Sequence, residues 1–321
     1  MSSVFSWITK AVLITAILVA AITISILAFL FFMFFDYSPF HFSGEGAHNI
    51  REAGLAYWTA DGRYLFTMEG QYGEGRLYRY DTKTWKRYFY KNIKFGGLLS
   101  VSPNGRMILS NYEYENSLYS IDLKTYRKSV LWQARGKLDL YDMHWIRPDI
   151  ILMIGRTPTG LDDVYKLSVP DGRLTKLTSN YGGMFFPAID GSGFIYENRW
   201  DNKLHFQELD TGKERAIITR HLKYFRSYCY MYLSKDVLIY QKNTGPEHQA
   251  EILDLATLKD THFNLDKPGE YPSAGVMSPN LTMYLPNAGS SHFGGDRYVY
   301  DLPKAAVKII KQKIKETSGD K

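Results

Sequence analysis

The chain of 321 residues is long enough for one large domain or two ordinary ones, and its 45% hydrophobic and 15% aromatic residues supply a sizeable core. The net charge of +6 is small and spread along the chain, which disfavours a nucleic-acid-binding protein. The single cysteine, Cys229, excludes an intrachain disulfide, and its apolar aromatic neighbours indicate a buried small side chain rather than a nucleophile.

The first 35 residues are typical of a membrane anchor. Residues 1–10 are expected to form a short cytoplasmic N-terminus, and the 25 residues from 11 to 35 contain no charge. As a helix this segment would be about 37 Å long, enough to span a hydrocarbon core of about 30 Å. It lacks a small-residue cleavage site, so we favour an uncleaved signal anchor over a cleaved signal peptide. Lys10 before it and Asp36 after it favour an extracytoplasmic body, which would be periplasmic in a bacterium.

Residues 36–53 are interpreted as a linker, because Pro39, Gly44 and Gly46 punctuate the stretch. His41 and His48 lie within it. A metal pair is one interpretation of these two histidines. We favour solvated linker histidines, because no cysteine or acidic cluster lies at ligand spacing.

A unit of about 44 residues recurs six times in residues 54–312. Each unit opens with a polar turn, followed by a hydrophobic strand and a second strand that ends near an aspartate. The turn markers are Asp61, Asn104, Asp149, Asp190, Lys235 and Asn280, spaced by 43, 45, 41, 45 and 45 residues. This period, with four short strands per unit, is that of a propeller blade. The sequence predicts an all-β, six-bladed β-propeller of four-stranded antiparallel blades, preceded by one transmembrane helix.

Aspartates that recur once per blade are interpreted as turn residues, because Asp accepts local backbone hydrogen bonds in turns. The interpretation covers Asp61, Asp81, Asp122, Asp210 and Asp254.

The repeated pattern S-P-[DN]-G-[RK], followed by L-Y-x-[YIL]-D, resembles the repeats of TolB-type and WD40-like propellers. It is also similar to the propeller repeats of prolyl oligopeptidase and dipeptidyl peptidase relatives. The resemblance covers Leu55 to Ile310. Neither the separate α/β domain of TolB nor the hydrolase domain of the peptidases is recognised here. The resemblance therefore implies a propeller used as a binding platform, as TolB is for its protein partners.

In such a propeller the strands of each blade run A to D from the central channel outward. The A–B and C–D turns then share one face, and the more variable B–C and D–A loops share the other. Binding groups concentrate on variable loops of rigid scaffolds. We therefore expect a protein-interaction or ligand-binding module whose partner is another envelope protein, a peptide or a carbohydrate. The candidate residues are Tyr72, Glu74, Tyr112, Glu113, Tyr114, Glu115, Arg156, Glu197, Arg199, Trp200, Asp201, His248 and His292.

The D–A loops on that face carry basic residues: Lys91, Lys94, Arg135, Lys137, Arg220, Lys223 and Arg226. The first blade is also expected to begin there. The linker would then reach the propeller on the variable-loop face, and this face would look toward the membrane.

No hydrolase, P-loop, dinucleotide-binding or zinc-protease motif occurs, so no catalytic residue, metal or cofactor is assigned. The alternative is a metal-dependent propeller hydrolase that resembles calcium-dependent lactonases. Its site would lie in the central channel, where Asp142 and His144 are expected on an inner strand. Calcium is implied only under this alternative.

The basic segment from Lys304 onward completes the chain. Val307, Ile309 and Ile310 are interpreted as the outer strand of the last blade, with residues 313–321 as a flexible basic tail. The alternative is an amphipathic helix on a membrane surface.

Overall fold

A computed structural model of the chain describes most of the predicted propeller and its C-terminal extension. The described residues are 47–50, 53–69, 76–91, 93, 97–112, 115–133, 138–217, 230–241, 249–264, 275–286, 298–302 and 304–317. The predicted cytoplasmic N-terminus, the predicted membrane span, His41 and Cys229 lie outside this set. Among the residues in it, no helix combines the length and apolar character needed to cross a bilayer.

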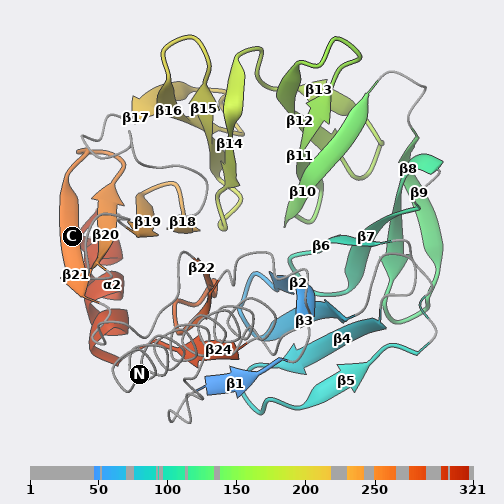
Figure 1. The fold of residues 1–321 in the computed structure, drawn as a ribbon, viewed down its shortest axis with the longest axis horizontal. Coiled ribbons are helices and arrows are strands. Elements are labelled where there is room, and N and C mark those ends of the chain that lie inside the picture. The colour runs from blue at the N-terminus through green and yellow to red at the C-terminus, as the bar shows by residue number, and fades with distance from the viewer. Residues whose placement is uncertain are drawn as a thin grey trace, which may run out of the picture. The chain divides into compact units, whose positions relative to one another are not determined.

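The described residues form six four-stranded antiparallel sheets, which Figure 1 shows arranged around a common centre. Blade one contains β2 (Ala53–Trp58), β3 (Tyr64–Glu69), β4 (Arg76–Asp81) and β5 (Arg87–Phe89). Blade two contains β6 (Gly97–Val101), β7 (Met107–Tyr112), β8 (Glu115–Asp122) and β9 (Lys128–Gln133). Blade three contains β10 (Asp139–Arg147), β11 (Ile150–Arg156), β12 (Asp162–Ser168) and β13 (Leu174–Lys176).

The second half of the chain repeats the arrangement. Blade four contains β14 (Tyr181–Pro187), β15 (Gly193–Asn198), β16 (Lys203–Glu208) and β17 (Glu214–Ile217). Blade five contains β18 (Tyr230–Leu233), β19 (Val237–Gln241), β20 (Gln249–Asp254) and β21 (Asp260–Asn264). Blade six contains β22 (Gly275–Met277), β23 (Met283–Pro286), β24 (Tyr298–Asp301) and β1 (Ala47–Asn49).

This architecture confirms the predicted all-β propeller with four-stranded antiparallel blades. Each turn marker, from Asp61 to Asn280, lies between the first and second strands of one sheet. We call the side that carries these A–B turns and the C–D turns the turn face. The opposite side, which carries the B–C and D–A loops, is the loop face.

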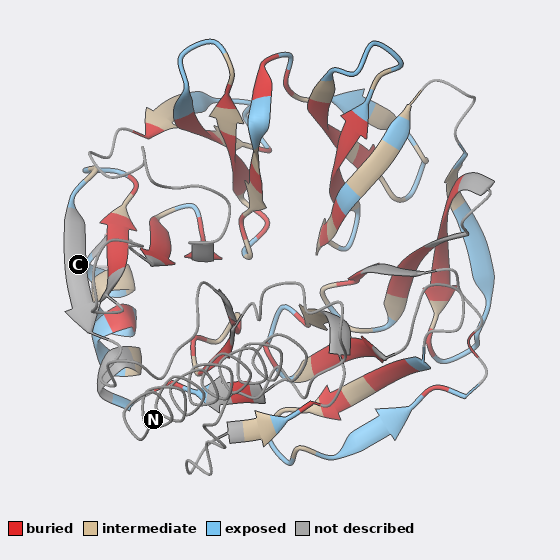
Figure 2. Ribbon diagram, viewed as in Figure 1, coloured by how far each residue is buried: buried red, intermediate tan, exposed pale blue. Residues whose placement is uncertain are grey.

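Apolar side chains hold each blade against the next. Strands of this kind alternate inward and outward side chains, so a blade buries both faces only between two neighbours. Six clusters of buried side chains lie between successive sheets, and Figure 2 shows the buried positions along the strands. The cluster between the first and last blades contains Leu65, Tyr78, Tyr80, Met283, Leu285 and Val299. It closes the ring of blades.

Blade six takes its outer strand from the N-terminal side of the body, not from the C-terminal segment. Ala47 pairs with Tyr300 and Asn49 pairs with Tyr298, so β1 runs antiparallel to β24. The prediction of an outer strand at residues 304–312 is therefore wrong, as is the placement of Ala47–Asn49 in a linker. Tyr80 reinforces the junction, because its hydroxyl donates a 3.0 Å hydrogen bond to the carbonyl of Ile50.

The β1 pairing also corrects the interpretation of His48 as a solvated linker histidine. Its ring stacks on the indole of Trp85 in blade one, with a centroid distance of 3.9 Å. Its Nε2 atom lies 3.5 Å from the carboxylate of Asp301 in blade six. The side chain therefore contacts the first and last blades at the point where they meet.

The C-terminal segment forms α2 (Lys304–Thr317), so the predicted flexible tail from residue 313 is helical as far as Thr317. Val307, Ile310 and Ile314 repeat at helical spacing and pack into the core cluster between blades five and six. Ile310 is fully buried. This helix is part of the folded body and lies against β20 and β21.

Candidate functional site

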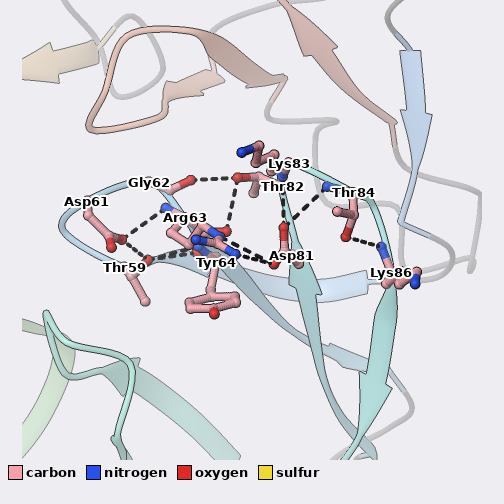
Figure 3. A network of polar contacts seen from close by, with 10 residues as sticks. All are labelled: Thr59, Asp61, Gly62, Arg63, Tyr64, Asp81, Thr82, Lys83, Thr84 and Lys86. Atoms are coloured by element: carbon pink, nitrogen blue, oxygen red, sulfur yellow. Dashed lines mark hydrogen bonds and ion pairs between the residues drawn. The ribbon is translucent and has the colours of Figure 1, made fainter.

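The repeated aspartates are scaffold residues, as predicted. Figure 3 shows the two turns of blade one, where the Asp61 carboxylate accepts hydrogen bonds from the Thr59 hydroxyl at 2.6 Å and the Arg63 amide at 2.9 Å. In the next turn the Asp81 carboxylate accepts from the Lys83 amide and from the Arg63 guanidinium. The guanidinium is the main cause of the lowered pKa of Asp81. These carboxylates are engaged in holding turns.

Asp122 and Asp254 repeat the turn geometry of Asp81. Each accepts hydrogen bonds from the two backbone amides that follow the strand end. Asp210 is also a scaffold residue but acts differently, because its carboxylate receives Arg147 from the neighbouring blade at 2.6 and 2.9 Å. All three aspartates therefore have a structural role, as predicted. Asp122 and Asp254 hold their own turns, whereas Asp210 joins two blades.

Of the predicted binding residues, five have described side chains, and all five lie on the loop face of blades three and four. They are Arg156, Glu197, Arg199, Trp200 and Asp201. Tyr112 and Glu115 face each other across the end of the β7–β8 hairpin, where only the backbone is described. The remaining candidates lie outside the described residues: Tyr72, Glu74, Glu113, Tyr114, His248 and His292.

Arg199 fixes the β15–β16 hairpin to its surroundings. Its guanidinium donates to the Tyr181 carbonyl at 2.6 and 2.9 Å and to the Asp162 carbonyl of blade three at 3.3 Å. Its backbone amide donates to the Asn180 carbonyl at 2.6 Å. A guanidinium occupied in this way is a structural clamp between two blades, so Arg199 is removed from the set of ligand contacts.

Asp201 is also engaged within the hairpin. Its carboxylate accepts from the Lys203 amide at 3.0 Å and lies 2.9 Å from the Nε2 atom of His205. The other ring nitrogen of His205 contacts the Glu214 carboxylate of the outer strand. This chain of polar contacts ties the hairpin tip to the outer edge of blade four.

Trp200 lies between these two anchored residues and projects into solvent. It is 72% exposed, more than any other large apolar side chain in the described part of the body. Its amide donates to the side chain of Asn198 at 2.9 Å, and the Asn202 amide donates to the Asn198 carbonyl at 2.9 Å. Asn202 has φ of 54°, the left-handed conformation that a tight hairpin turn requires. The indole is therefore presented from a rigid turn.

The positive charge of Arg156 is partly neutralised by a carboxylate of its own blade. Its guanidinium forms two hydrogen bonds with the Asp162 carboxylate, at 2.8 and 3.1 Å, and lies 5.3 Å from the ring centroid of Tyr141. Arg156 is the main cause of the lowered pKa of Asp162. Burial, together with the Asp162 carboxylate, raises the pKa of Tyr141 to about 12, so this phenol stays protonated at neutral pH.

Irregular inner strands shape the edge between blades three and four. The β10–β11 register shifts between Tyr141 and His144, where Asp142 has φ of 49°. The β14–β15 register shifts between Tyr181 and Phe185. Such bulges re-aim side chains at strand ends. The bulge in β10 brings the Asp142 carboxylate to 3.0 Å from Nε2 of His144.

Two glycines on the inner strand of blade four lie close to Glu197, which is half-buried. A Cβ atom on Gly182 would lie 3.1 Å from Glu197, and one on Gly183 would lie 3.7 Å from its carboxylate oxygen. Gly183 also has φ of 136°, a backbone conformation that residues with a side chain rarely adopt. Burial first, and then the negative charges of Asp142, Asp162 and Glu197, raise the pKa of nearby Tyr181. The inner ends of blades three and four are therefore acidic and backbone-rich.

The predictions omitted Tyr141, Asp162, Tyr181 and the two glycines. Gly182-Gly183 at the start of an inner strand was the one sequence signal for this edge, since paired glycines in a strand mark a bulge or a close approach.

Of the calcium site in the alternative prediction, the structure describes Asp142 and His144. Calcium takes six to eight oxygen ligands. Asp142 is paired with His144, and no three His, Cys, Asp or Glu side chains form a group that could hold a metal ion within the part of the chain that the structure describes. We derive no metal chemistry from this channel.

No protein-family model matches the sequence, and a search of curated proteins found no match. Among solved structures, TolB from Acinetobacter baumannii is similar at 16% identity with a TM-score of 0.47; the alignment covers 66% of this chain and 54% of that one. A putative TolB from Agrobacterium tumefaciens is 16% identical with a TM-score of 0.48, covering 80% and 97%. An oligogalacturonate lyase in complex with manganese is 12% identical with a TM-score of 0.45, covering 81% and 91%.

The chain thus spans about half the length of the first TolB and nearly all of the other two proteins. The similarity concerns the β-propeller fold alone, and it includes both a TolB and a lyase. Nothing about the function of this chain is taken from it.

Proposed function

We propose that this protein is a membrane-anchored, extracytoplasmic β-propeller that binds a protein partner, or a peptide or carbohydrate ligand, through its loop face. The observation that carries the proposal is the rigid presentation of Trp200. Because hydrogen bonds fix the backbone of the turn, little backbone entropy is lost on binding, and tryptophan is enriched among residues that dominate interfaces.

The surroundings of Trp200 support the same role. Glu197 lies three positions before it, half-buried beside Gly182 and Gly183. An exposed aromatic side chain on a hairpin that also carries a carboxylate suits a ligand with apolar surface and hydrogen-bond donors, such as a sugar or a peptide with a basic residue. On the turn face, by contrast, carboxylates such as Asp61 and Asp81 are occupied by turn hydrogen bonds.

Membrane anchorage is proposed on the sequence of residues 11–35, which are uncharged and long enough to span a bilayer. The single-pass topology, with the N-terminus in the cytoplasm, rests on Lys10 and Asp36.

The test is capture from native membranes with the full-length chain, comparing Trp200→Ala with Tyr126→Ala. Tyr126 is an exposed aromatic residue in a C–D turn, on the opposite face. We expect Trp200→Ala to weaken capture of a specific partner at least tenfold, as a hot-spot residue would. Tyr126→Ala should leave capture unchanged. Equal capture by both variants would refute the assignment to the loop face.

A further inference from the structure

We propose that the lysine row of α2 docks on the anionic phospholipid headgroups of the membrane that anchors the chain, so that the turn face and not the loop face looks toward the bilayer. The lysine row consists of Lys304, Lys308, Lys311 and Lys315. The inference rests on the anchorage part of the proposed function and adds an orientation and a lipid class to it.

The lysine row occupies one flank of the helix. At 100° per residue its four members fall within an arc of about 60°. All four side chains are exposed. The acidic residue of α2, Glu316, lies outside the arc and is bonded to Lys313 at 2.9 Å and to Gln312 at 2.9 Å. The flank is therefore a continuous strip of positive charge.

The apolar side of α2 is occupied by the propeller. Ile310 is fully buried, and Val307 and Ile314 pack against the same core cluster. The helix cannot insert these residues into lipid while the body stays folded. Contact with a membrane would therefore be electrostatic and peripheral, which requires an anionic surface.

The register of β1 places both ends of the body on the turn face. Ala47 pairs with Tyr300 near the end of β24 that leads to the turn face, and the Leu302 amide donates to the carbonyl of Thr282 in the A–B turn of blade six. The chain thus enters the body at Ala47 on the side where α2 begins. The prediction that the linker arrives on the loop face is wrong, because β1 was not foreseen.

The remaining linker is short. The eleven residues from Asp36 to Gly46 reach at most about 36 Å when fully extended. A body that starts at Ala47 would therefore stay near the bilayer that holds residues 11–35, within reach of its surface potential. The loop face, at the other end of each strand, would be left free for a partner.

The test uses the full-length chain with Cys229→Ser, reconstituted into vesicles that carry an energy-transfer acceptor on the lipid headgroup. A donor dye is attached at Gln312→Cys on α2 or at Leu161→Cys on the loop face. Vesicles of phosphatidylcholine alone are compared with vesicles that also contain phosphatidylglycerol. We expect stronger transfer from position 312 than from position 161, an increase with phosphatidylglycerol, and a loss of that increase in high salt.

Charge variants assign the effect. Each lysine near an anionic surface contributes about fivefold to binding, so neutralising all four lysines to glutamine should lower the equilibrium constant for docking several hundredfold and abolish the lipid-dependent increase. A two-charge comparison sets Lys308→Gln/Lys311→Gln against Lys91→Gln/Lys203→Gln, two exposed lysines near the loop face; the first pair should weaken the increase and the second should keep it.

Three results would overturn the proposal: stronger transfer from position 161, no dependence on phosphatidylglycerol, or an unchanged signal in the four-lysine variant. If the four-lysine variant instead failed to capture an acidic protein from native membranes while its energy transfer in vesicles stayed unchanged, the lysine row would be assigned to a protein partner. A wrong assignment of the membrane anchor can be distinguished from a wrong assignment of the lysine row. Without an anchor, the chain would dissociate from phosphatidylcholine vesicles yet still bind anionic vesicles in a lysine- and salt-dependent way. Loss of loop-face binding is detected only by the Trp200 comparison.

Discussion

Arg147 on the inner strand of blade three donates two hydrogen bonds to the carboxylate of Asp210 in blade four, at 2.6 and 2.9 Å. The same guanidinium donates through Nε to the Gly191 carbonyl at 2.7 Å. One side chain thus joins the A–B and C–D turns of one blade to the body of the previous blade. The arrangement is bidentate, which makes it stronger and more specific in geometry than a single ion pair.

The first prediction concerns this clamp. Arg147→Ala should lower the free energy of unfolding by about 2 kcal/mol, because it removes three hydrogen bonds from a largely covered guanidinium. Asp210→Asn should cost less, since its side chain is 72% exposed. Urea unfolding of the two single variants and the double variant measures the coupling. Strictly additive effects would contradict a direct interaction.

The same pair predicts a dependence of stability on pH. Arg147 lowers the pKa of Asp210 below its ordinary value of 3.8 in the folded protein. A lowered folded pKa adds stability that is fully present above the unfolded value and is lost as the pH falls through the folded value. We therefore expect the Asp210→Asn variant to lose less stability than the parent between pH 5 and pH 3, by urea unfolding. An equally steep decline in both proteins would show that the pair does not contribute.

The third prediction compares two left-handed glycines, both with φ of 67°. A Cβ atom at Gly212 would have no neighbouring atom within 4 Å, so Gly212→Ala should lower the free energy of unfolding by about 1 kcal/mol from backbone strain alone. Gly62→Ala would place a Cβ atom 2.7 Å from the side chain of Asn280 in blade six, so it should cost about 1–3 kcal/mol more. Thermal unfolding of the two variants makes the comparison. Equal losses would mean that the first and last turns do not pack as described.

The fourth prediction tests whether α2 belongs to the body. Ile310→Ala should destabilise the protein by about 3 kcal/mol, because the side chain is fully buried between blades five and six. Ile309→Ala removes a neighbouring side chain that is 43% exposed and should stay within about 0.5 kcal/mol of the parent. Chemical denaturation monitored by the intrinsic tryptophan fluorescence gives both values. A helix that detaches from the body would show two small, similar effects.

Much of the propeller could be predicted from the sequence because its information is local. The markers Asp61, Asn104, Asp190 and Asn280 each accept a hydrogen bond from the backbone of their own turn, and the strands beside them alternate polar and apolar residues. Two features at a constant spacing, the polar turn and the strand that ends near an aspartate, then define a blade without reference to the rest of the chain.

What the sequence did not reveal depends on contacts between distant residues. β1 has three residues, too few for a period to appear, and it is a strand because β24 offers it an edge. Because β1 occupies that edge, no outer strand is needed from the C-terminal segment, and Val307, Ile310 and Ile314 follow their helical spacing in α2. The bulges beside Asp142 and Gly183 likewise depend on register, so the acidic edge of blades three and four could not be placed beforehand.

The pairing of β1 with β24 has a consequence for how the chain is made. Asn49 precedes its partner Tyr298 by 249 positions. At about 5–20 residues per second, a ribosome produces the two strands roughly 12–50 s apart. During that interval β1 has no partner strand, and the unpaired strand edges already synthesised are vulnerable to mispairing. The last blade to be synthesised therefore sets the moment at which the ring of blades can close.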